Sequence, residues 1–343
     1  MTKVAVALSG GIDSAVVAAL LLEQGYDVVG VTGKMTCSED SEVVINNAKK
    51  VADKLGIQHF ICDVSKIFHD KVIKYFVNSY QKGETPNPCV MCNKHIKWGV
   101  LFDFAINELG VDYIATGHYA KIKKEGAFLK LYPACDEQKD QLYFLSTLSQ
   151  EHLFKTLFPL GDYKKSEVKM LAEKYDLPPK SAKESQDICF IKPPLTTKKY
   201  LNNVFSIQKG SFVEKTTGKV LGSHDGYWQY TVGQRKGIGI AAPYPLYVLE
   251  ICADENIVYV GSKEELIINT LTLDYVAWAY PIDTTSFEAM VKIRYNMKPV
   301  RANITISNIV QIEFLETVSA LAPGQACVIY DKYDGHLLAA GFI

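Results

Sequence analysis

One short glycine- and serine-rich segment near the N-terminus restricts the fold of this chain more than any other feature. The segment Ser9–Ser14 (SGGIDS) follows the apolar, β-branched run Lys3–Leu8 and precedes a helical pattern over residues 15–25. Its glycines permit a tight turn, and the backbone amides at the start of the helix remain free to bind an anion. The segment therefore predicts a phosphate site between a buried strand and the first helix of an α/β fold.

The residues of this loop narrow its chemistry. It lacks the Gly-Lys-Ser/Thr ending of a Walker loop, which argues against kinase-like or GTPase-like phosphate transfer. Ser9 and Ser14 supply hydroxyl donors, whereas Asp13 beside a phosphate suits a bound magnesium ion or a helix cap. The alternative is a plain glycine turn in front of an ordinary helix.

Strands and helices alternate over the N-terminal third of the chain. Expected strands cover residues 26–32, 57–64 and 114–116, and expected helices cover 46–55, 72–81 and 100–109. This alternation predicts a doubly wound parallel sheet with helices on both faces. Residues 140–175 show helical periodicity, interrupted at 159–161.

The pattern changes from about residue 210 onward, where short alternating strands are separated by glycine turns. Such spacing is typical of a β-barrel or sandwich. We therefore expect three domains: a phosphate-loop domain with a helical extension at 1–204, a central β-rich domain at 205–265 and a C-terminal β-barrel at 266–343.

Composition limits the class of protein and its partners. The 343 residues are 48% hydrophobic and 22% charged, which is ordinary for a globular protein. No apolar run approaches the length of a membrane span, and the N-terminus does not resemble a signal peptide, so we expect a cytoplasmic protein. Because the net charge is −1, any RNA binding requires basic residues gathered locally.

Two regions place cysteines in settings suited to chemistry. Cys89 and Cys92 follow two prolines and have the spacing of metal ligands or of a redox pair, although incidental thiols in a turn remain the alternative. The neighbouring Lys94, His95 and Lys97 are expected to favour the thiolate form. Cys189 stands before an apolar pair and is a weak signal when taken alone.

A basic strip lies near the C-terminus. Residues 291–301 contain Lys292, Arg294, Lys298 and Arg301 and no acidic residue. The strip is a candidate for contacts with RNA phosphates, and the alternative is an exposed strand face with solvated charges.

Taken together, the motifs resemble one family. SGGIDS, TPNPCVMCNKHIKWG, ATGHYAKI, KDQLYFL, LFPLGDYKKSEV, SQDICFI, YTVGQRKGIGI, VKIRYNMKP and PGQACV occur in the order found in the tRNA 2-thiouridylases of the MnmA type. The resemblance covers nearly the whole chain. It implies the PP-loop, or adenine nucleotide alpha hydrolase-like, fold of the ATP pyrophosphatases, which split ATP into AMP and pyrophosphate.

The resemblance implies an ATP-dependent, sulfur-inserting reaction on the wobble uridine of tRNA, with adenylation of the uridine 2-oxygen. In this scheme Cys189 carries sulfur as a persulfide, Cys92 attacks and closes a transient disulfide with Cys189, and AMP is released. Asp13 acts at the catalytic centre together with Mg²⁺. The residues that the resemblance assigns to ATP are Leu8, Ser9, Gly10, Gly11, Ile12, Asp13, Ser14, Met35 and Gly117.

The resemblance also implies partners. It requires a tRNA and a sulfur-donor or sulfur-relay protein, and we expect a monomer. Tyr295 is suited to stacking on an unpaired base. The residues assigned to tRNA are Asn87, Pro88, Cys89, His118, Lys139, Asp140, Gln141, Arg294, Tyr295 and Gln325.

One departure from the family leaves the sulfur route open. Some members carry Asp where this chain has Cys89, so Cys89, Cys92 and Cys189 together suit a 4Fe–4S cluster as well as the persulfide route, which we favour. Rival interpretations are another PP-loop adenylating enzyme, a non-enzymatic RNA-binding or sulfur-carrier module, and a structural zinc site that lacks two of its four ligands.

Overall fold

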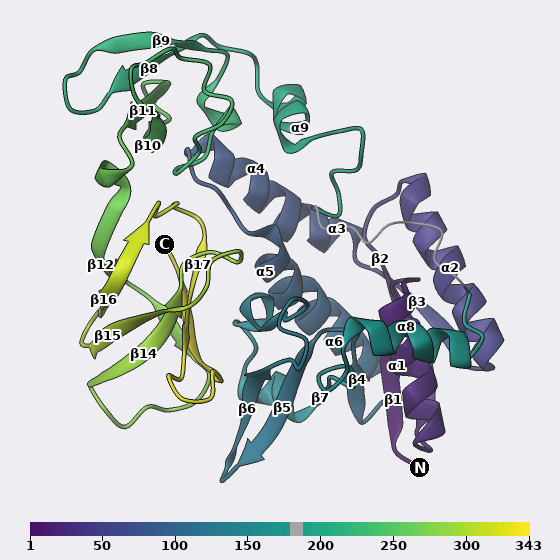
Figure 1. The fold of residues 1–343 in the computed structure, drawn as a ribbon. Coiled ribbons are helices and arrows are strands. Elements are labelled where there is room, and N and C mark those ends of the chain that lie inside the picture. The colour runs from purple at the N-terminus through teal and green to yellow at the C-terminus, as the bar shows by residue number, and fades with distance from the viewer. Residues whose placement is uncertain (179–187) are drawn as a thin grey trace.

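The computed structural model describes residues 1–178 and 188–343 and divides them among three regions (Figure 1). An N-terminal α/β region carries a parallel sheet, a small β-rich region follows, and the chain ends in an antiparallel sheet. The expected fold class is therefore confirmed. Ser185, Gln186 and Asp187 of the SQDICFI motif lie outside the described residues.

The N-terminal sheet has the strand order β3-β2-β1-β4-β7, and every pair in it is parallel. Parallel strands need crossover connections, and helices provide most of them here. The strands are β1 (Lys3–Ala7), β2 (Asp27–Lys34), β3 (Gln58–Asp63), β4 (Tyr113–Ala115) and β7 (Thr156–Leu157).

Alternate residues of β1 enter two different cores. Val4 and Val6 pack against α1 (Ile12–Glu23), α2 (Glu39–Leu55) and α8 (Lys165–Lys174) on one face. Ala5 faces the opposite core, which the helices between Ser65 and Glu108 complete. Because successive strand residues point to opposite faces, an entirely apolar strand implies cover on both sides, as the sequence predicted.

The helices between residues 65 and 108, interrupted at 82–87, cover more residues than expected, and they include three π-helical stretches, of which η2 is kinked at Trp98 and Gly99. Wider π turns shift which side chains share a face, and they occur often at functional sites. The elements are α3 (Ser65–Phe68), η1 (His69–Ile73), α4 (Lys74–Gln81), α5 (Pro88–Cys92), η2 (Asn93–Val100), α6 (Leu101–Asp103) and η3 (Phe104–Glu108).

The sequence predicted no element for the segment between β4 and residue 140. This segment forms the hairpin β5 (Ala120–Glu125) and β6 (Phe128–Pro133), and only short helices follow it. These are η4 (Leu142–Leu145), α7 (Gln150–Phe154) and α9 (Thr197–Val204), in addition to α8. None of the helices in the described ranges is long and apolar enough to cross a membrane.

The last two regions are built from strands. The central sheet has the order β10-β11-β8-β9, and the C-terminal sheet has the order β12-β16-β15-β14-β17-β18-β13. Their elements are β8 (Gly210–Glu214), β9 (Val220–His224), η5 (Tyr227–Gln229), β10 (Tyr247–Cys252), β11 (Ile257–Gly261), η6 (Glu264–Leu266), β12 (Ile267–Leu273), β13 (Val276–Trp278), β14 (Ser286–Lys292), β15 (Val300–Ile306), β16 (Val310–Ser319), β17 (Ala326–Tyr330) and β18 (Leu337–Phe342).

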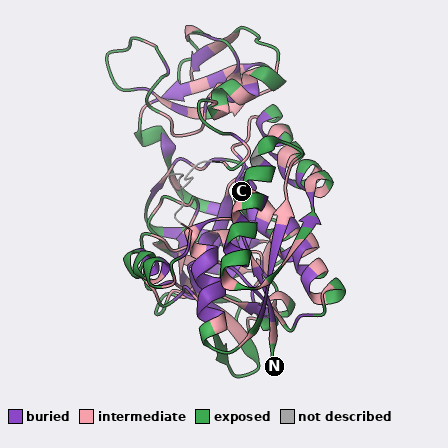
Figure 2. Ribbon diagram, turned by 90° about the vertical axis from the view of Figure 1, so that its right-hand side faces the viewer, coloured by how far each residue is buried: buried purple, intermediate pink, exposed green. Residues whose placement is uncertain are grey.

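The C-terminal sheet shares a hydrophobic core with the N-terminal region. Ala326, Val328 and Leu337 belong to the same buried cluster as Ala5 and the helices of residues 65–108. Figure 2 shows the buried residues concentrated in the sheets and the exposed residues on the outer loops and outer helix faces. This shared core holds the C-terminal sheet against the helices that carry Cys89 and Cys92.

Candidate active site

The phosphate loop connects β1 to α1 at the carboxyl end of the central strand. Gly10 has φ +66°, and a Cβ at this position would lie 2.8 Å from the Cβ of Asn47, so only glycine fits. The Ser14 hydroxyl donates to the Gly11 carbonyl at 3.0 Å and accepts from the Ser9 amide at 3.2 Å. No side chain caps the helix at Gly11, which leaves the first amides of α1 available to an anion.

Asp13 forms a tight cluster with two residues that the sequence analysis did not single out. The Lys165 ammonium donates to both Asp13 carboxylate oxygens, at 2.6 and 2.8 Å, and the Tyr119 hydroxyl donates to Oδ1 at 2.9 Å. Lys165 is nearly buried, whereas about a third of the Asp13 side chain is exposed. Both residues lie inside motifs quoted above, ATGHYAKI and GDYKKSEV, but no sequence pattern links them to Asp13.

The contacts of Asp13 within this cluster affect where the expected magnesium ion can bind. Both Asp13 oxygens already accept hydrogen bonds from an ammonium, so a direct Mg²⁺ bond at this carboxylate requires Lys165 to move. Asp13 is also not the cap of α1, since Gly11 occupies that position. The geometry thus favours Mg²⁺ carried by the nucleotide phosphates over a dedicated protein site.

The other residues assigned to ATP surround this loop. A Cβ on Gly117 would lie 3.0 Å from the Asp13 Cβ and 3.1 Å from the Ser14 amide, so the β4 end runs directly against the first turn of α1. Leu8 is buried and fills the space beside Gly30, while Met35 is half-buried against the core at the end of β2.

The structure brings Cys89, Cys92 and Cys189 together, although Cys189 is far away in the sequence. Cys89 and Cys189 both lie near enough to Cys92 that the thiolate form of either raises the Cys92 pKa, and Cys89 raises the pKa of Cys189 in the same way. All three are free thiols; Cys89 and Cys189 are exposed and Cys92 is half-buried. The Asn87 side chain caps α5 by accepting from the Val90 amide, which fixes the start of the helix.

The expectation that these thiols favour the thiolate was wrong. Removal of the thiol from water by surrounding protein atoms raises the pKa of Cys92 to about 12, and it also raises the pKa values of Cys89 and Cys189, although part of each of these two residues reaches the surface. Lys97 opposes this shift at each thiol, but its effect is smaller than that of burial. Lys94 instead acts on His95, whose pKa is lowered first by burial and then by that charge.

His118 is buried and engaged on both ring nitrogens. Its Nε2 lies 3.0 Å from the Lys97 ammonium, and its Nδ1 lies 2.7 Å from the Thr116 hydroxyl. Burial, followed by the Lys97 charge, lowers the His118 pKa well below its usual range, so the ring is neutral. In this arrangement the ring holds Lys97 in place and does not face solvent.

Lys139, Asp140 and Gln141, which follow β6 and are expected to contact RNA, form hydrogen bonds that stabilise their own loop. Asp140 accepts from the Ala134 amide at 2.8 Å and from the Leu142 amide at 3.2 Å, and burial raises its pKa. Gln141 accepts from the Tyr119 amide at 3.1 Å. The Lys139 amide donates to the Asp136 carbonyl at 3.0 Å. This loop is therefore preformed beside Tyr119 and the phosphate loop.

Two residues of the C-terminal region, in the loops after β14 and before β17, contact the N-terminal region. The Tyr295 ring lies 4.4 Å from that of Phe144, and its hydroxyl donates to the Asp140 carbonyl at 3.4 Å. The Gln325 amide donates to the Thr85 carbonyl at 2.6 Å, just before Asn87 and Pro88. Tyr295 is thus half-buried where the C-terminal and N-terminal regions meet. To stack on a base, the Tyr295 ring must first lose the contact that now covers one of its faces.

The basic strip of residues 291–301 is not one continuous face. Lys292 is half-buried and lies over the Tyr143 and Tyr295 rings, at 5.8 and 5.2 Å from their centroids. Arg301 pairs with Glu316. Arg294 and Lys298 are exposed, and they remain the members of the strip best placed for phosphates.

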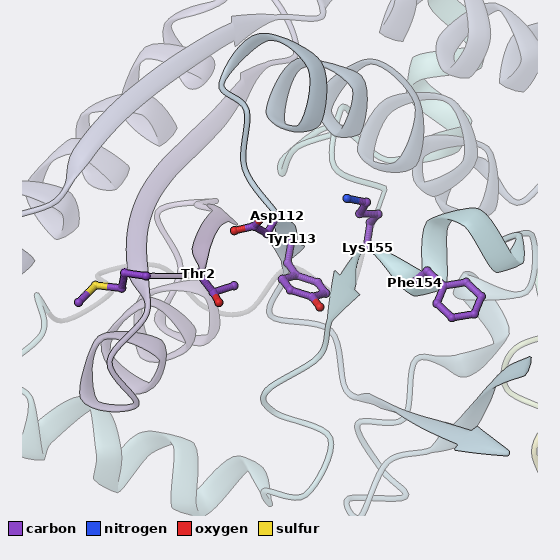
Figure 3. A pocket seen from close by; sticks show the side chains of 6 residues that line it. Thr2, Asp112, Tyr113, Phe154 and Lys155 are labelled. Atoms are coloured by element: carbon purple, nitrogen blue, oxygen red, sulfur yellow. The ribbon is translucent and has the colours of Figure 1, made fainter. Parts of the chain in front are cut away.

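Two other features lie away from this site. A pocket of about 450 Å³ is lined by Thr2, Asp112, Tyr113 and Lys155 among others, at the amino ends of β1, β4 and β7 (Figure 3). Ligands of open α/β sheets bind at the opposite, carboxyl edge, where the phosphate loop lies.

The second feature is a carboxylate–imidazole cluster of Asp331, Asp334 and His336. His336 already bonds Asp334 through Nδ1 and the Tyr280 hydroxyl through Nε2, both at 2.5 Å. With both ring nitrogens occupied, this cluster is a structural brace.

Three family models match successive parts of the chain. They are described as the tRNA methyl transferase HUP domain at residues 2–193, the tRNA methyl transferase PRC-barrel domain at 198–262 and the aminomethyltransferase beta-barrel domain at 268–343. Together they span almost the entire sequence.

Full-length relatives give a more specific description. The tRNA-specific 2-thiouridylase MnmA of Synechococcus sp. (strain JA-2-3B'a(2-13)) is 42% identical over 99% of this chain and 94% of its own length. The tRNA-specific 2-thiouridylase MnmA of Carboxydothermus hydrogenoformans is 42% identical over 96% of this chain and 94% of its own length. A solved structure, the U34-tRNA thiolase NcsA from Methanococcus maripaludis with its 4Fe–4S cluster, is 22% identical over 55% of this chain and 60% of its own, with a TM-score of 0.37.

Proposed function

The chain belongs to the tRNA-specific 2-thiouridylase family, and from this premise we propose that it uses ATP to replace the 2-oxygen of a tRNA uridine with sulfur. The observation that carries the proposal is that the N-terminal domain holds a phosphate loop and three free thiols, connected through Gly117 at the loop, the adjoining His118, and Lys97, whose charge acts on all three thiols. The family models bear methyltransferase descriptions, but an ATP loop beside paired thiols suits adenylation and sulfur transfer.

The first half-reaction activates the uridine. Its 2-oxygen attacks the α-phosphate of ATP bound at Ser9–Ser14 with Mg²⁺, and pyrophosphate leaves. The free amides of α1 and the Asp13–Lys165 pair supply the donors and the charge at this end of the site. The adenylate then carries a good leaving group, AMP, in place of an oxygen that would not leave.

The second half-reaction transfers sulfur. We propose that the terminal sulfur of a Cys189 persulfide attacks C2 of the uridine and expels AMP. Cys92 then attacks the Cys189 sulfur, the S–S bond to the uridine breaks, and a Cys92–Cys189 disulfide forms. A dithiol reductant must restore both thiols before the next cycle, and a sulfur-donor protein must reload Cys189.

The cluster alternative uses the same residues. Cys89, Cys92 and Cys189 are mutual electrostatic neighbours, which fits three ligands of a 4Fe–4S cluster with one iron free of protein ligands. Such a cluster would supply a bound sulfide to the activated base. The thiol set fits both routes, and the persulfide route needs no more than Cys92 and Cys189.

The proposal also covers the oligomeric state, the domains and the tRNA contacts of this protein. We propose a monomer that acts in the cytoplasm on the wobble uridine of its tRNA, with domains at 1–204, 205–265 and 266–343. The uridine lies beside Asn87, Pro88 and Cys89, and Arg294, Tyr295 and Gln325 contact the RNA. The direct contacts of Tyr295 and Gln325 with the N-terminal domain support one composite RNA surface.

One experiment distinguishes the persulfide route from the cluster route. Protein purified without oxygen is analysed for iron and by ultraviolet–visible spectroscopy, and 2-thiouridine formation in tRNA is measured with ATP and a sulfur source. The persulfide route predicts iron-free active protein that loses activity in Cys189→Ala but retains it in Cys89→Ala. A brown protein whose iron and activity both disappear in Cys89→Ala would establish the cluster route.

A further inference from the structure

Lys97 carries a half-buried positive charge for which residues 1–178 and 188–343 supply no counter-charge. Its ammonium lies 3.0 Å from His118, and no carboxylate pairs with it among residues 1–178 and 188–343. An ammonium removed from water without an anion is costly, so a protein retains one chiefly where a ligand completes the pair. Lys94 on the same helix differs, because it is exposed to solvent.

The surroundings hold this ammonium in one position. His118 is neutral and accepts from Lys97 through Nε2, while its Nδ1 bonds Thr116. The next helix residue, Trp98, is buried and donates through its indole nitrogen to the Thr156 hydroxyl at 2.8 Å. Lys97 is therefore fixed before any substrate arrives, as electrostatic catalysis requires.

This position lies between the nucleotide loop and the thiols. Gly117, which precedes His118, touches the first turn of α1 at Asp13 and Ser14. On the other side, the Lys97 charge acts on all three thiols of the site.

We propose that the Lys97 ammonium binds the phosphate of the adenylated uridine, the AMP group that forms on the 2-oxygen and later leaves. This rests on the proposed function. The α-phosphate must reach both the loop that holds ATP and the thiols that deliver sulfur, so it lies where Lys97 lies. The ammonium stabilises negative charge as the bond from phosphorus to pyrophosphate breaks, and again as the C2–O bond breaks and AMP departs.

A role limited to creating thiolates explains the site less well. The pKa values of the three thiols remain raised despite Lys97, so the resting thiols are neutral and do not neutralise the ammonium. The substrate phosphate would supply the anion that the described part of the site does not provide. The partner is thus identified by its chemistry, a phosphate ester attached to a nucleobase oxygen.

Lys97→Met tests the proposal because it retains the side-chain length and removes the charge. Formation of pyrophosphate and AMP from ATP is followed in a single turnover with tRNA, and the affinities for ATP and tRNA are measured separately. Loss of one preorganised charge should slow pyrophosphate formation by roughly 100- to 1,000-fold, with both affinities changed less than about threefold. Lys97→Arg should retain more of the rate, and Lys94→Met is the matched control, expected to behave as wild type.

Two results for Lys97→Met would contradict the proposed role of Lys97, and one result for wild-type protein would contradict the proposed function. Normal pyrophosphate formation in Lys97→Met with loss of 2-thiouridine alone would assign Lys97 to the thiols and overturn the proposal, as would a wild-type rate throughout. Wild-type protein that forms no AMP in the presence of tRNA would instead remove the proposed function itself. If Lys97→Met does not fold, as judged by circular dichroism, Lys97→Gln serves the same test.

Discussion

The clearest prediction concerns the reactivity of Cys92. With a pKa of about 12, its thiolate fraction at pH 7 is about 10⁻⁵, compared with about 3% for an ordinary thiol of pKa 8.5. This roughly 3,000-fold deficit is partly offset because a more basic thiolate is intrinsically more nucleophilic, by about 40-fold at a Brønsted slope near 0.45. Cys92 should therefore react with iodoacetamide about 100-fold more slowly than a free thiol at pH 7.

The assay is timed alkylation of the native protein followed by digestion and mass spectrometry of the Cys92 peptide. Raising the pH increases the thiolate fraction, so the rate should rise about tenfold per pH unit up to pH 10 without levelling off. The exposed Cys37 provides an internal comparison in the same digest, and protein unfolded in urea gives the unburied rate. A Cys92 rate that levels off below pH 9 would refute the assignment of burial as the dominant influence.

Three further predictions follow from the site. Gly10→Ala should abolish ATP binding, because at φ +66° the new Cβ would lie 2.8 Å from a side chain of helix α2. Gly25→Ala is the control, because its φ is also positive, at +83°, but no atom lies near its new Cβ, so this variant should bind ATP normally. Calorimetric titration with ATP distinguishes the two variants. Asp13→Ala and Lys165→Met should each stop pyrophosphate formation, since the two side chains form one unit, and persistent activity in either contradicts this. Arg294→Ala should weaken tRNA binding and lower the salt slope by about 1, and an unchanged slope would show that it does not touch phosphate.

The phosphate loop and the sheet were predictable because their signals are local. A strand, two glycines and a helix specify the loop within residues 3–25, and the apolar run of β1 implied cover on both faces. The hairpin of β5 and β6 was missed since its lysines and glycine obscure the alternation of apolar residues. Helix lengths were underestimated where the apolar periodicity changes at π turns.

The composition of the site was less predictable. Asp13 meets Lys165 and Tyr119 only through the folded chain, across sequence separations of 152 and 106 residues. The charge state of the thiols was misjudged because a sequence shows neighbouring cations but not burial, and burial dominates here. The half-buried state of Tyr295 depends in the same way on packing between domains.

The proposed reaction couples each ATP cleavage to one sulfur insertion. The measurement is the ratio of AMP released to 2-thiouridine formed, with tRNA, ATP, a sulfur source and a dithiol reductant, for wild-type protein and Cys189→Ala. We predict one AMP for each 2-thiouridine, located at the wobble position, and no 2-thiouridine from Cys189→Ala. AMP formation without any 2-thiouridine in wild-type protein, or full thiolation by Cys189→Ala, would contradict the account.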